Sequence, residues 1–197
     1  SLIHRDIKPQ NIMVCHRGAG CDVVKVLDFG LVKELTAEAT MTMSISESPK
    51  YMSPESITAP QDVTLATDIY SLGITAFFML TGRYPFNKGD SPTAALFQHI
   101  NATPKRPSEV VKFSVPEDLE NLIMKCMSRD PKDRPASMND LAKELLTCED
   151  AYGWDKLKAM EWWAEHPGIL QNTTDKLRPA TRENFDSTLK IHVAQES

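Results

Sequence analysis

Four polar side chains near the start of the chain have the types and spacing that phosphate chemistry needs. Asp6, Lys8 and Asn11 lie in the stretch HRDIKPQN (residues 4–11), and Asp28 begins the triplet DFG. A carboxylate such as Asp6 can orient a hydroxyl group and accept its proton, and the Lys8 ammonium can meet the charge of a transferring phosphoryl group. The Asn11 carboxamide and the Asp28 carboxylate offer the hard oxygen ligands that Mg²⁺ prefers. The set suits chemistry on phosphate groups that are held with a magnesium ion.

Both stretches resemble the catalytic loop and the metal-binding triplet of the protein kinases, in the same order along the chain. The resemblance implies that Asp6, Lys8 and Asn11 are catalytic. It further implies that Asn11 and Asp28 bind Mg²⁺, and that Lys8, Asn11 and Asp28 bind ATP. Lys8 followed by Pro9 resembles the serine/threonine kinases, so we expect the acceptor to be a Ser or Thr hydroxyl of a protein substrate. A chance match is the alternative, and the two motifs together with landmarks downstream argue against it.

The polar stretch between residues 28 and 55 resembles the activation segment of that family. It ends at SPE (residues 53–55), where the family usually has Ala in place of Ser53. We hypothesise that phosphorylation activates the protein, because Arg5 is a cation that can capture a phosphate and order the segment. The alternative is a solvated loop that is merely rich in hydroxyl groups. The candidate sites are Thr40 and Thr42 first, then Ser44 and Ser46.

Three further landmarks complete the resemblance. Ser48 keeps the hydroxyl that the family's Thr uses near the substrate, although Glu47 replaces a Gly whose backbone freedom Glu lacks. Asp68 would accept hydrogen bonds from the backbone of the catalytic loop, and the alternative is an ordinary carboxylate favoured by the helix dipole. Arg134 would form a buried ion pair with Glu55, and removing one partner of such a pair typically costs about 3–5 kcal/mol.

Composition narrows the class of protein. The 197 residues suffice for one domain with a sizeable core, and the net charge of −5 argues against a nucleic-acid partner. No apolar run is long enough for a membrane segment, and no signal peptide is visible. The four cysteines form no Cys-x-x-Cys pair. This spacing favours reduced thiols over structural zinc and indicates a cytoplasmic location.

The resemblance implies the fold of a kinase C-terminal lobe over residues 1–148, mainly α-helical with a short β-hairpin. Apolar runs at residues 12–14 and 23–27 predict the hairpin, joined by a turn over residues 15–22. Apolar periodicity predicts helices over residues 66–81, 92–102, 116–128 and 137–147. The buried face of the last helix is predicted to comprise Met138, Leu141, Ala142 and Leu145.

A separate segment over residues 149–197 lies beyond the resemblance. One amphipathic helix ending near Pro167 is predicted there from Trp154, Leu157, Met160, Trp162 and Trp163. This helix is expected either to pack on the lobe or to form a docking surface, since aromatic residues dominate interface hot spots. The polar residues after Gly168 predict a loosely attached tail.

The chain contains no Gly-rich phosphate loop, strand lysine or helix glutamate of a kinase N-lobe. Because ATP binds between the two lobes in that family, we expect a fragment of a serine/threonine kinase that is inactive without its missing N-lobe. Two alternatives stay open: a non-catalytic interaction module derived from a kinase lobe, and a lobe that works when its other half is supplied in trans. The runs at residues 69–73 and 81–86 resemble bacterial kinases of the eukaryotic type.

Overall fold

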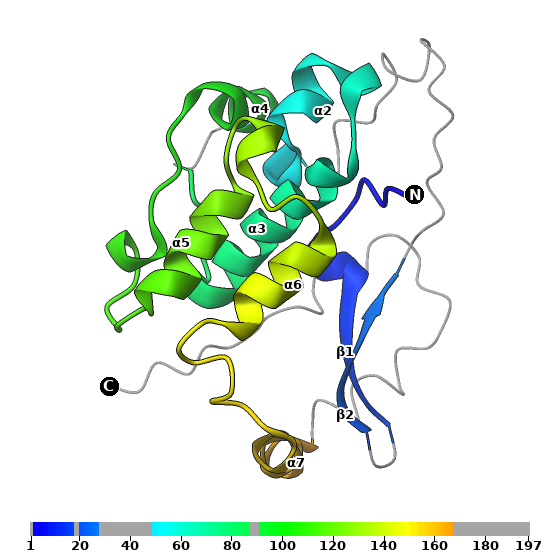
Figure 1. The fold of residues 1–197 in the computed structure, drawn as a ribbon, viewed down its shortest axis with the longest axis vertical. Helices are drawn as coiled ribbons and strands as arrows, with labels where there is room; N and C mark the ends of the chain where they lie inside the picture. Colours follow the sequence, from blue (N-terminus) through cyan, green and yellow to red (C-terminus); the bar gives the residue numbers. More distant parts are fainter. Residues whose placement is uncertain (1, 18–19, 28–48, 87–90, 168–197) are drawn as a thin grey trace.

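The computed structural model of the chain describes residues 2–17, 20–27, 49–86 and 91–167 (Figure 1). A helical lobe surrounds one central helix, and a two-stranded hairpin extends away from it. The described residues are mainly α-helical with one short antiparallel sheet, which confirms the expected fold class. Some residues with predicted functional roles lie outside the described ranges, namely Asp28, Thr40, Thr42, Ser44, Ser46 and Ser48.

The hairpin is longer than the sequence indicates. Strand β1 (Ile12–Arg17) pairs antiparallel with strand β2 (Gly20–Val26). The predicted turn over residues 15–22 is therefore wrong, because both strands continue through most of it. The register shifts between Cys15 and Arg17, and on the opposite strand Asp22 adopts a left-handed backbone with φ of 56°. Asp tolerates this conformation better than most residues, so it suits the irregular position.

Apart from the hairpin, the described residues form α-helices and single 3-10 turns. The helices are α2 (Pro54–Thr58), α3 (Leu65–Thr81), α4 (Pro92–Asn101), α5 (Glu117–Cys126), α6 (Met138–Leu146) and α7 (Lys156–Glu165). The 3-10 turns span Pro9–Asn11, Pro49–Tyr51, Pro60–Asp62, Pro107–Glu109 and Pro131–Asp133. Each turn begins at proline, whose fixed φ suits a first helical position where no N–H is needed. The helices predicted within residues 66–147 are present as α3 to α6, whereas α2 is too short to give a periodic pattern.

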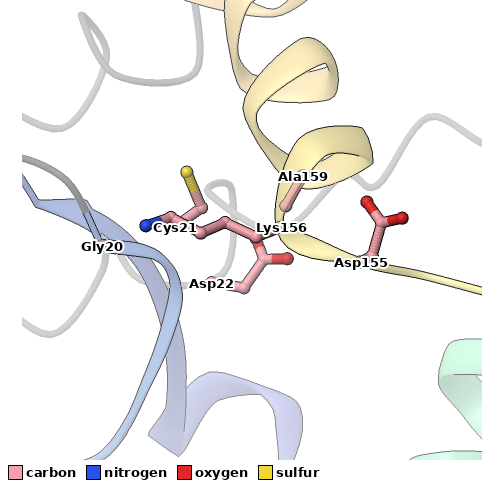
Figure 2. A pocket seen from close by; sticks show the side chains of 6 residues that line it. All are labelled: Gly20, Cys21, Asp22, Asp155, Lys156 and Ala159. Atoms are coloured by element: carbon pink, nitrogen blue, oxygen red, sulfur yellow. The ribbon is translucent and has the colours of Figure 1, made fainter. Parts of the chain in front are cut away.

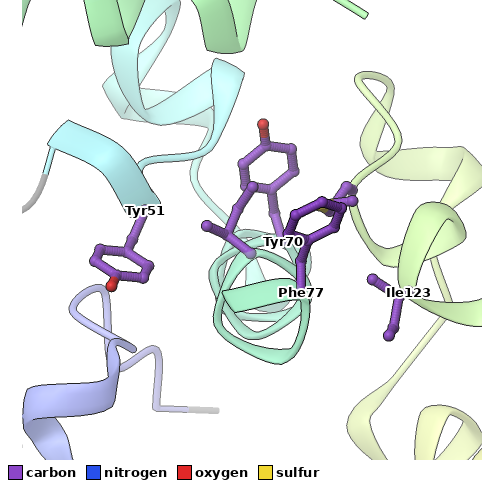
Figure 3. Close-up of a cluster of buried hydrophobic side chains, with 6 residues drawn as sticks. Tyr51, Tyr70, Phe77 and Ile123 are labelled. Atoms are coloured by element: carbon purple, nitrogen blue, oxygen red, sulfur yellow. The ribbon is translucent and has the colours of Figure 1, made fainter. Parts of the chain in front are cut away.

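Helix α3 forms the centre of the lobe. Its side chains Tyr70, Ile74 and Phe77 are buried and pack in one apolar cluster with Tyr51 and Ile123 (Figure 3). Burying apolar side chains of this size contributes on the order of 1.5–3 kcal/mol each. The first turn of α3 carries Asp68, which accepts hydrogen bonds from the backbone of His4 and Arg5.

Helices α3 and α5 approach each other closely at a glycine. A Cβ atom built on Gly73 would lie 2.7 Å from the Cβ of Cys126 on α5, so no larger residue fits without a shift. At its other end α3 stops at Gly82, which takes the left-handed conformation (φ 66°) and donates its N–H to the Phe78 carbonyl. Gly is favoured at this capping position because it has no Cβ. None of the described helices is long and apolar enough to cross a membrane.

The predicted buried face of residues 137–147 is mostly wrong. In α6 Leu141 is buried, whereas Met138, Ala142 and Leu145 are exposed. Helix α6 lies at the edge of the lobe and packs against α5 on one side (Figure 1). The spacing of apolar residues therefore predicts the helix correctly, but another element covers less of its apolar face than that spacing suggests.

Helix α7 lies beside the hairpin, far along the chain from it (Figure 1). It buries Ala159 and Trp163 against β2, while Leu157 and Met160 on its other side are exposed. The predicted helix is present, but its apolar residues do not form one buried face. The helix packs against the hairpin on one side, and the alternative of a docking surface stays a prediction.

Candidate functional site

The carboxylate of Asp6 is fixed by two other side chains of its own loop. The Nζ atom of Lys8 lies 2.9 Å from Asp6 Oδ2, and Asn11 donates Nδ2–H to the same oxygen at 2.9 Å. Asn11 also donates to the backbone carbonyl of Asp6 at 2.7 Å. The proline-initiated turn Pro9–Asn11 directs the chain back toward Asp6, which makes this contact possible. The structure thus brings together the three residues to which the sequence assigns catalysis.

These three side chains differ in their access to solvent. Lys8 and Asn11 are buried, and the Lys8 side chain keeps 11% of its surface exposed. The Asp6 side chain keeps 22% exposed. The carboxylate is therefore the group of this cluster that a second molecule can reach most easily, while its two partners are fixed by the surrounding protein.

The backbone of the loop is anchored to α3 through Asp68. The N–H groups of His4 and Arg5 donate to the two carboxylate oxygens of Asp68, each at 2.8 Å. Arg5 has a φ of 66°, a left-handed conformation that costs a non-glycine residue on the order of 1–3 kcal/mol. The two hydrogen bonds that the buried Asp68 carboxylate accepts offset this strain. Arg5 itself remains exposed, with its side chain directed to the surface.

A second set of contacts links the loop to the end of the hairpin. Leu27 donates its N–H to the Asn11 carbonyl at 2.8 Å, and its own carbonyl lies 2.9 Å from His4 Nε2. The N–H of Asp6 in turn donates to His4 Nδ1 at 3.3 Å. Leu27 directly precedes Asp28 in the sequence. The buried His4 ring therefore connects the segment before Asp28 with the segment that carries Asp6.

Of the two residues that the sequence assigns to Mg²⁺, Asn11 lies among the described residues. The described residues contain no group of three or more His, Cys, Asp or Glu side chains that could hold a metal ion. Asn11 points its amide nitrogen at Asp6, so its carboxamide oxygen faces away from that carboxylate. A single carboxamide oxygen suits Mg²⁺, which takes few protein ligands and keeps several waters. Asn11 fits the ion, and Asp28 lies outside the described residues.

The pair formed by Glu55 and Arg134 ties α2 to the end of the lobe. Arg134 donates through both terminal nitrogens to the two Glu55 oxygens at 2.7 and 2.8 Å, and Thr67 donates to Glu55 at 2.8 Å. The Arg134 side chain is fully buried and also donates to the carbonyls of Ala66, Ser128 and Arg129. Burial is the largest single influence and raises the pKa of Glu55, but the hydrogen bonds from Arg134, from the backbone and from Thr67, together with the charge of Arg134, lower it overall.

An open pocket of about 420 Å³ lies away from this loop, between β2 and α7 (Figure 2). Its lining residues are Gly20, Cys21, Asp22, Asp155, Lys156 and Ala159. None of these belongs to the cluster around Asp6, so the pocket is a feature of the contact between the hairpin and the C-terminal helix.

Sequence reasoning assigned no role to several residues that the structure makes prominent. The His4 ring contacts the backbone of Asp6 and of Leu27, and no spacing rule indicates the contact with Leu27. The side-chain oxygen of Gln10 is buried without a hydrogen-bond partner among the described residues, which is uncommon for a buried polar atom. No local pattern in the sequence marks Asp22 as important, because its two partners lie more than a hundred residues further along the chain.

Comparison with known proteins adds an independent line of information. Residues 1–147 match the family described as the protein kinase domain. A probable serine/threonine-protein kinase of Clostridium perfringens, CPE1738, is 39% identical over 145 residues, which are 73% of this chain and 20% of that protein. The probable kinase PknB of Bifidobacterium longum is 38% identical over 149 residues, covering 74% of this chain and 21% of that protein. The kinase PrkC of Bacillus subtilis is 38% identical over 152 residues, covering 76% of this chain and 22% of that protein.

These three relatives are bacterial, and each carries the name of a serine/threonine-protein kinase. The chain spans about a fifth of the length of the relatives it matches. The match begins at the first residue and ends close to α6, so α7 lies beyond the matched part of the chain.

Proposed function

The chain belongs to the protein kinase domain family and is similar to bacterial serine/threonine kinases, and from this premise we propose that it transfers the γ-phosphoryl group of ATP to Ser or Thr hydroxyl groups of proteins. The observation that carries the proposal is the Asp6 carboxylate, fixed by Lys8 and Asn11 at 2.9 Å each. Phosphoryl transfer depends mainly on positioning and on charge stabilisation, and this loop supplies a fixed carboxylate beside a fixed cation.

We assign to Asp6 the binding and deprotonation of the substrate's acceptor hydroxyl. Both of its side-chain partners contact Oδ2, which leaves Oδ1 to orient the hydroxyl and accept its proton. General bases of this kind contribute on the order of 10²–10⁴-fold to a rate. The backbone N–H groups of His4 and Arg5 donate to Asp68, which fixes the two residues before Asp6 and so keeps the Asp6 carboxylate in place.

Lys8 and Asn11 act on the phosphate side of the reaction. The Lys8 ammonium stabilises the negative charge of the transferring group, because it is buried and close to the proton acceptor. Asn11 and Asp28 are the residues that would hold Mg²⁺, and the bound ion would neutralise charge on the phosphates of ATP. The orientation of the Asn11 amide, with nitrogen toward Asp6, leaves its oxygen for this purpose.

Activity is expected to require the N-terminal lobe of the same kinase as a partner. ATP binds between two lobes in this family, and the chain spans about a fifth of its curated relatives. We therefore infer that residues 1–197 alone transfer little phosphate, and that an N-lobe supplied in cis or in trans restores transfer.

The test is transfer of radiolabelled phosphate from ATP to a generic protein substrate in the presence of Mg²⁺. The 197-residue chain is assayed alone and joined to the N-lobe encoded upstream of Ser1 or, failing one, the N-lobe of a relative. The joined protein should phosphorylate Ser and Thr, and Asp6→Asn should lower its rate at least about a hundredfold. The matched control is Asp133→Asn, which changes the same side chain in an exposed turn.

Two results would contradict the proposal. A joined protein that binds ATP and Mg²⁺ but transfers no phosphate would favour the non-catalytic interaction module. Equal rates for Asp6→Asn and Asp133→Asn would remove Asp6 from the reaction.

A further inference from the structure

The carboxylate of Asp22 joins the hairpin to the segment that follows the kinase domain. Trp154 donates its indole Nε1–H to Asp22 Oδ2 at 2.6 Å, and Trp163 donates to Oδ1 at 2.7 Å. Each oxygen thus receives a hydrogen bond from a different indole. We call these three residues, Asp22, Trp154 and Trp163, the indole clasp.

The clasp is supported by packing around Trp163. This side chain is buried, and its ring centroid lies 5.7 Å from that of His16 on β1. Ala159, one helical turn earlier on α7, is also buried against β2. Trp163 therefore contacts both strands, through His16 on one and Asp22 on the other. Hydrogen bonds from the two indoles lower the pKa of Asp22, so the charged acceptor persists over a wide pH range.

The same hairpin ends at the catalytic loop. Asn11 directly precedes β1, Leu27 directly follows β2, and the Leu27 N–H donates to the Asn11 carbonyl at 2.8 Å. The strands pair continuously from Ile12 opposite Val26 to Cys15 opposite Val23, so this ladder connects the catalytic loop with the irregular part of the hairpin. Asp22 lies at the irregular part of this ladder, where the register is least determined by strand pairing.

We propose that Asp22 is a positioning residue for the proposed phosphoryl transfer, through which α7 fixes the hairpin and thereby the geometry at Asn11. The inference rests on the proposed function, since it assigns Asn11 to the magnesium site. It gives the C-terminal segment beyond residue 147 a role in the reaction: release of α7 from Asp22 loosens the hairpin and weakens magnesium binding.

The first experiment measures hydrogen exchange of backbone amides in the full 197-residue chain by nuclear magnetic resonance. Trp163→Phe keeps an aromatic ring and removes the N–H donor, and Asp22→Ala removes the acceptor. Both should speed exchange at the Leu27 amide about fivefold or more, the lower range of measured coupling between sites. The matched control is Trp162→Phe, because Trp162 is the neighbouring indole on α7 and stacks on His166.

A milder variant keeps the test decisive if Trp163→Phe disturbs the packing of α7. Trp154→Phe removes the other donor from a side chain that is 53% exposed, so it leaves the buried contacts intact. It should speed exchange at Leu27 in the same direction. If exchange at Leu27 is unchanged in Trp154→Phe, Trp163→Phe and Asp22→Ala, the hairpin does not depend on the clasp and the inference is overturned.

The second experiment separates positioning from simple stabilisation. In the protein joined to an N-lobe, the Mg²⁺ concentration for half-maximal rate should rise about fivefold or more in Asp22→Ala and Trp163→Phe, while kcat at saturating Mg²⁺ changes less. Asp22→Asn, which keeps one acceptor oxygen, should lie between wild type and Asp22→Ala. Altered exchange with an unchanged Mg²⁺ dependence would overturn the positioning role.

The two proposals fail in different ways. If the wild-type joined protein transfers no phosphate at any Mg²⁺ concentration, the proposed function fails. The hydrogen-exchange experiment still decides whether the clasp controls the hairpin, because it needs neither ATP nor activity.

Discussion

Two carboxylates in this protein join parts of the chain that are far apart, and they do so in different surroundings. Glu55 pairs with the fully buried Arg134 inside the helical lobe, with opposite charges and a bidentate geometry. Asp22 accepts two neutral indole N–H groups at the edge of the molecule, where Trp154 is largely exposed. We expect the first contact to open only when the lobe unfolds, because Arg134 is fully buried, and the second to open while the lobe stays folded. We therefore expect the lobe to carry the contacts that stabilise the fold, and the periphery to carry a contact that can change without unfolding.

The largest expected effect tests the interior contact. Arg134→Ala should lower the free energy of unfolding by about 3–5 kcal/mol, because Glu55 is left as a buried charge without its partner. Chemical denaturation measures the loss. Lys132→Ala, an exposed cation in the preceding turn, is the matched control and should change stability little. Equal stabilities for the two variants would contradict the buried role of the pair.

The second prediction concerns pH and the same pair. The folded-state pKa of Glu55 is lowered below its usual value of 4.5, so the pair's contribution is present above pH 4.5 and is lost as the pH falls toward the lowered value. Unfolding curves between pH 3 and pH 7 should therefore show stability falling in the acid range. In Glu55→Gln this dependence should be shallower, and an identical acid slope in both proteins would show that other carboxylates account for it.

A third prediction applies one substitution to both regions. Gly73→Ala places a Cβ 2.7 Å from Cys126 inside the lobe and should cost about 1–3 kcal/mol through overpacking. Gly153→Ala places a Cβ 3.2 Å from the Asp150 carbonyl in an exposed turn beside the clasp, so it should cost less. Thermal unfolding of both variants checks the order. A reversed order would mean that the periphery is packed more tightly than the lobe.

The smallest expected effect lies in the clasp itself. Asp22→Ala should lower global stability less than Gly73→Ala does, since the contact lies at the periphery and its donors are neutral. Denaturation followed by far-ultraviolet circular dichroism, which reports helix content, measures this. A loss as large as that of Arg134→Ala would place the clasp among the contacts that hold the lobe together and end the contrast between the two regions.

The parts of the fold that could be predicted are those with local signals. Apolar periodicity located the ends of α3 to α6 to within two residues, because apolar side chains recur at helical spacing in each of these segments. The same signal failed for the buried face of α6, since periodicity cannot tell which apolar side chains another element will cover. It also failed at the hairpin turn, where strand pairing continues through residues of low apolar content.

The residues of the candidate site also differ in whether a local sequence pattern indicates them. Asp6, Lys8 and Asn11 could be named from eight consecutive residues, because the types and their spacing carry the chemistry. The contacts of His4 with Leu27, and of Asp22 with two indoles, depend on tertiary placement and leave no pattern in the sequence. The spacing of the tryptophans predicts an aromatic surface on a helix, but it does not indicate that Asp22 accepts their hydrogen bonds.

The tryptophan positions have an optical consequence. All three tryptophans of the chain, Trp154, Trp162 and Trp163, lie in or just before α7, and the helical lobe has none. Intrinsic indole fluorescence therefore reports on the surroundings of Asp22 and does not report on the packing around α3. Unfolding followed by fluorescence traces the departure of α7 from the hairpin, whereas circular dichroism traces the helices. Coincident curves would show one cooperative unit, and an earlier fluorescence change would display the clasp opening on a folded lobe.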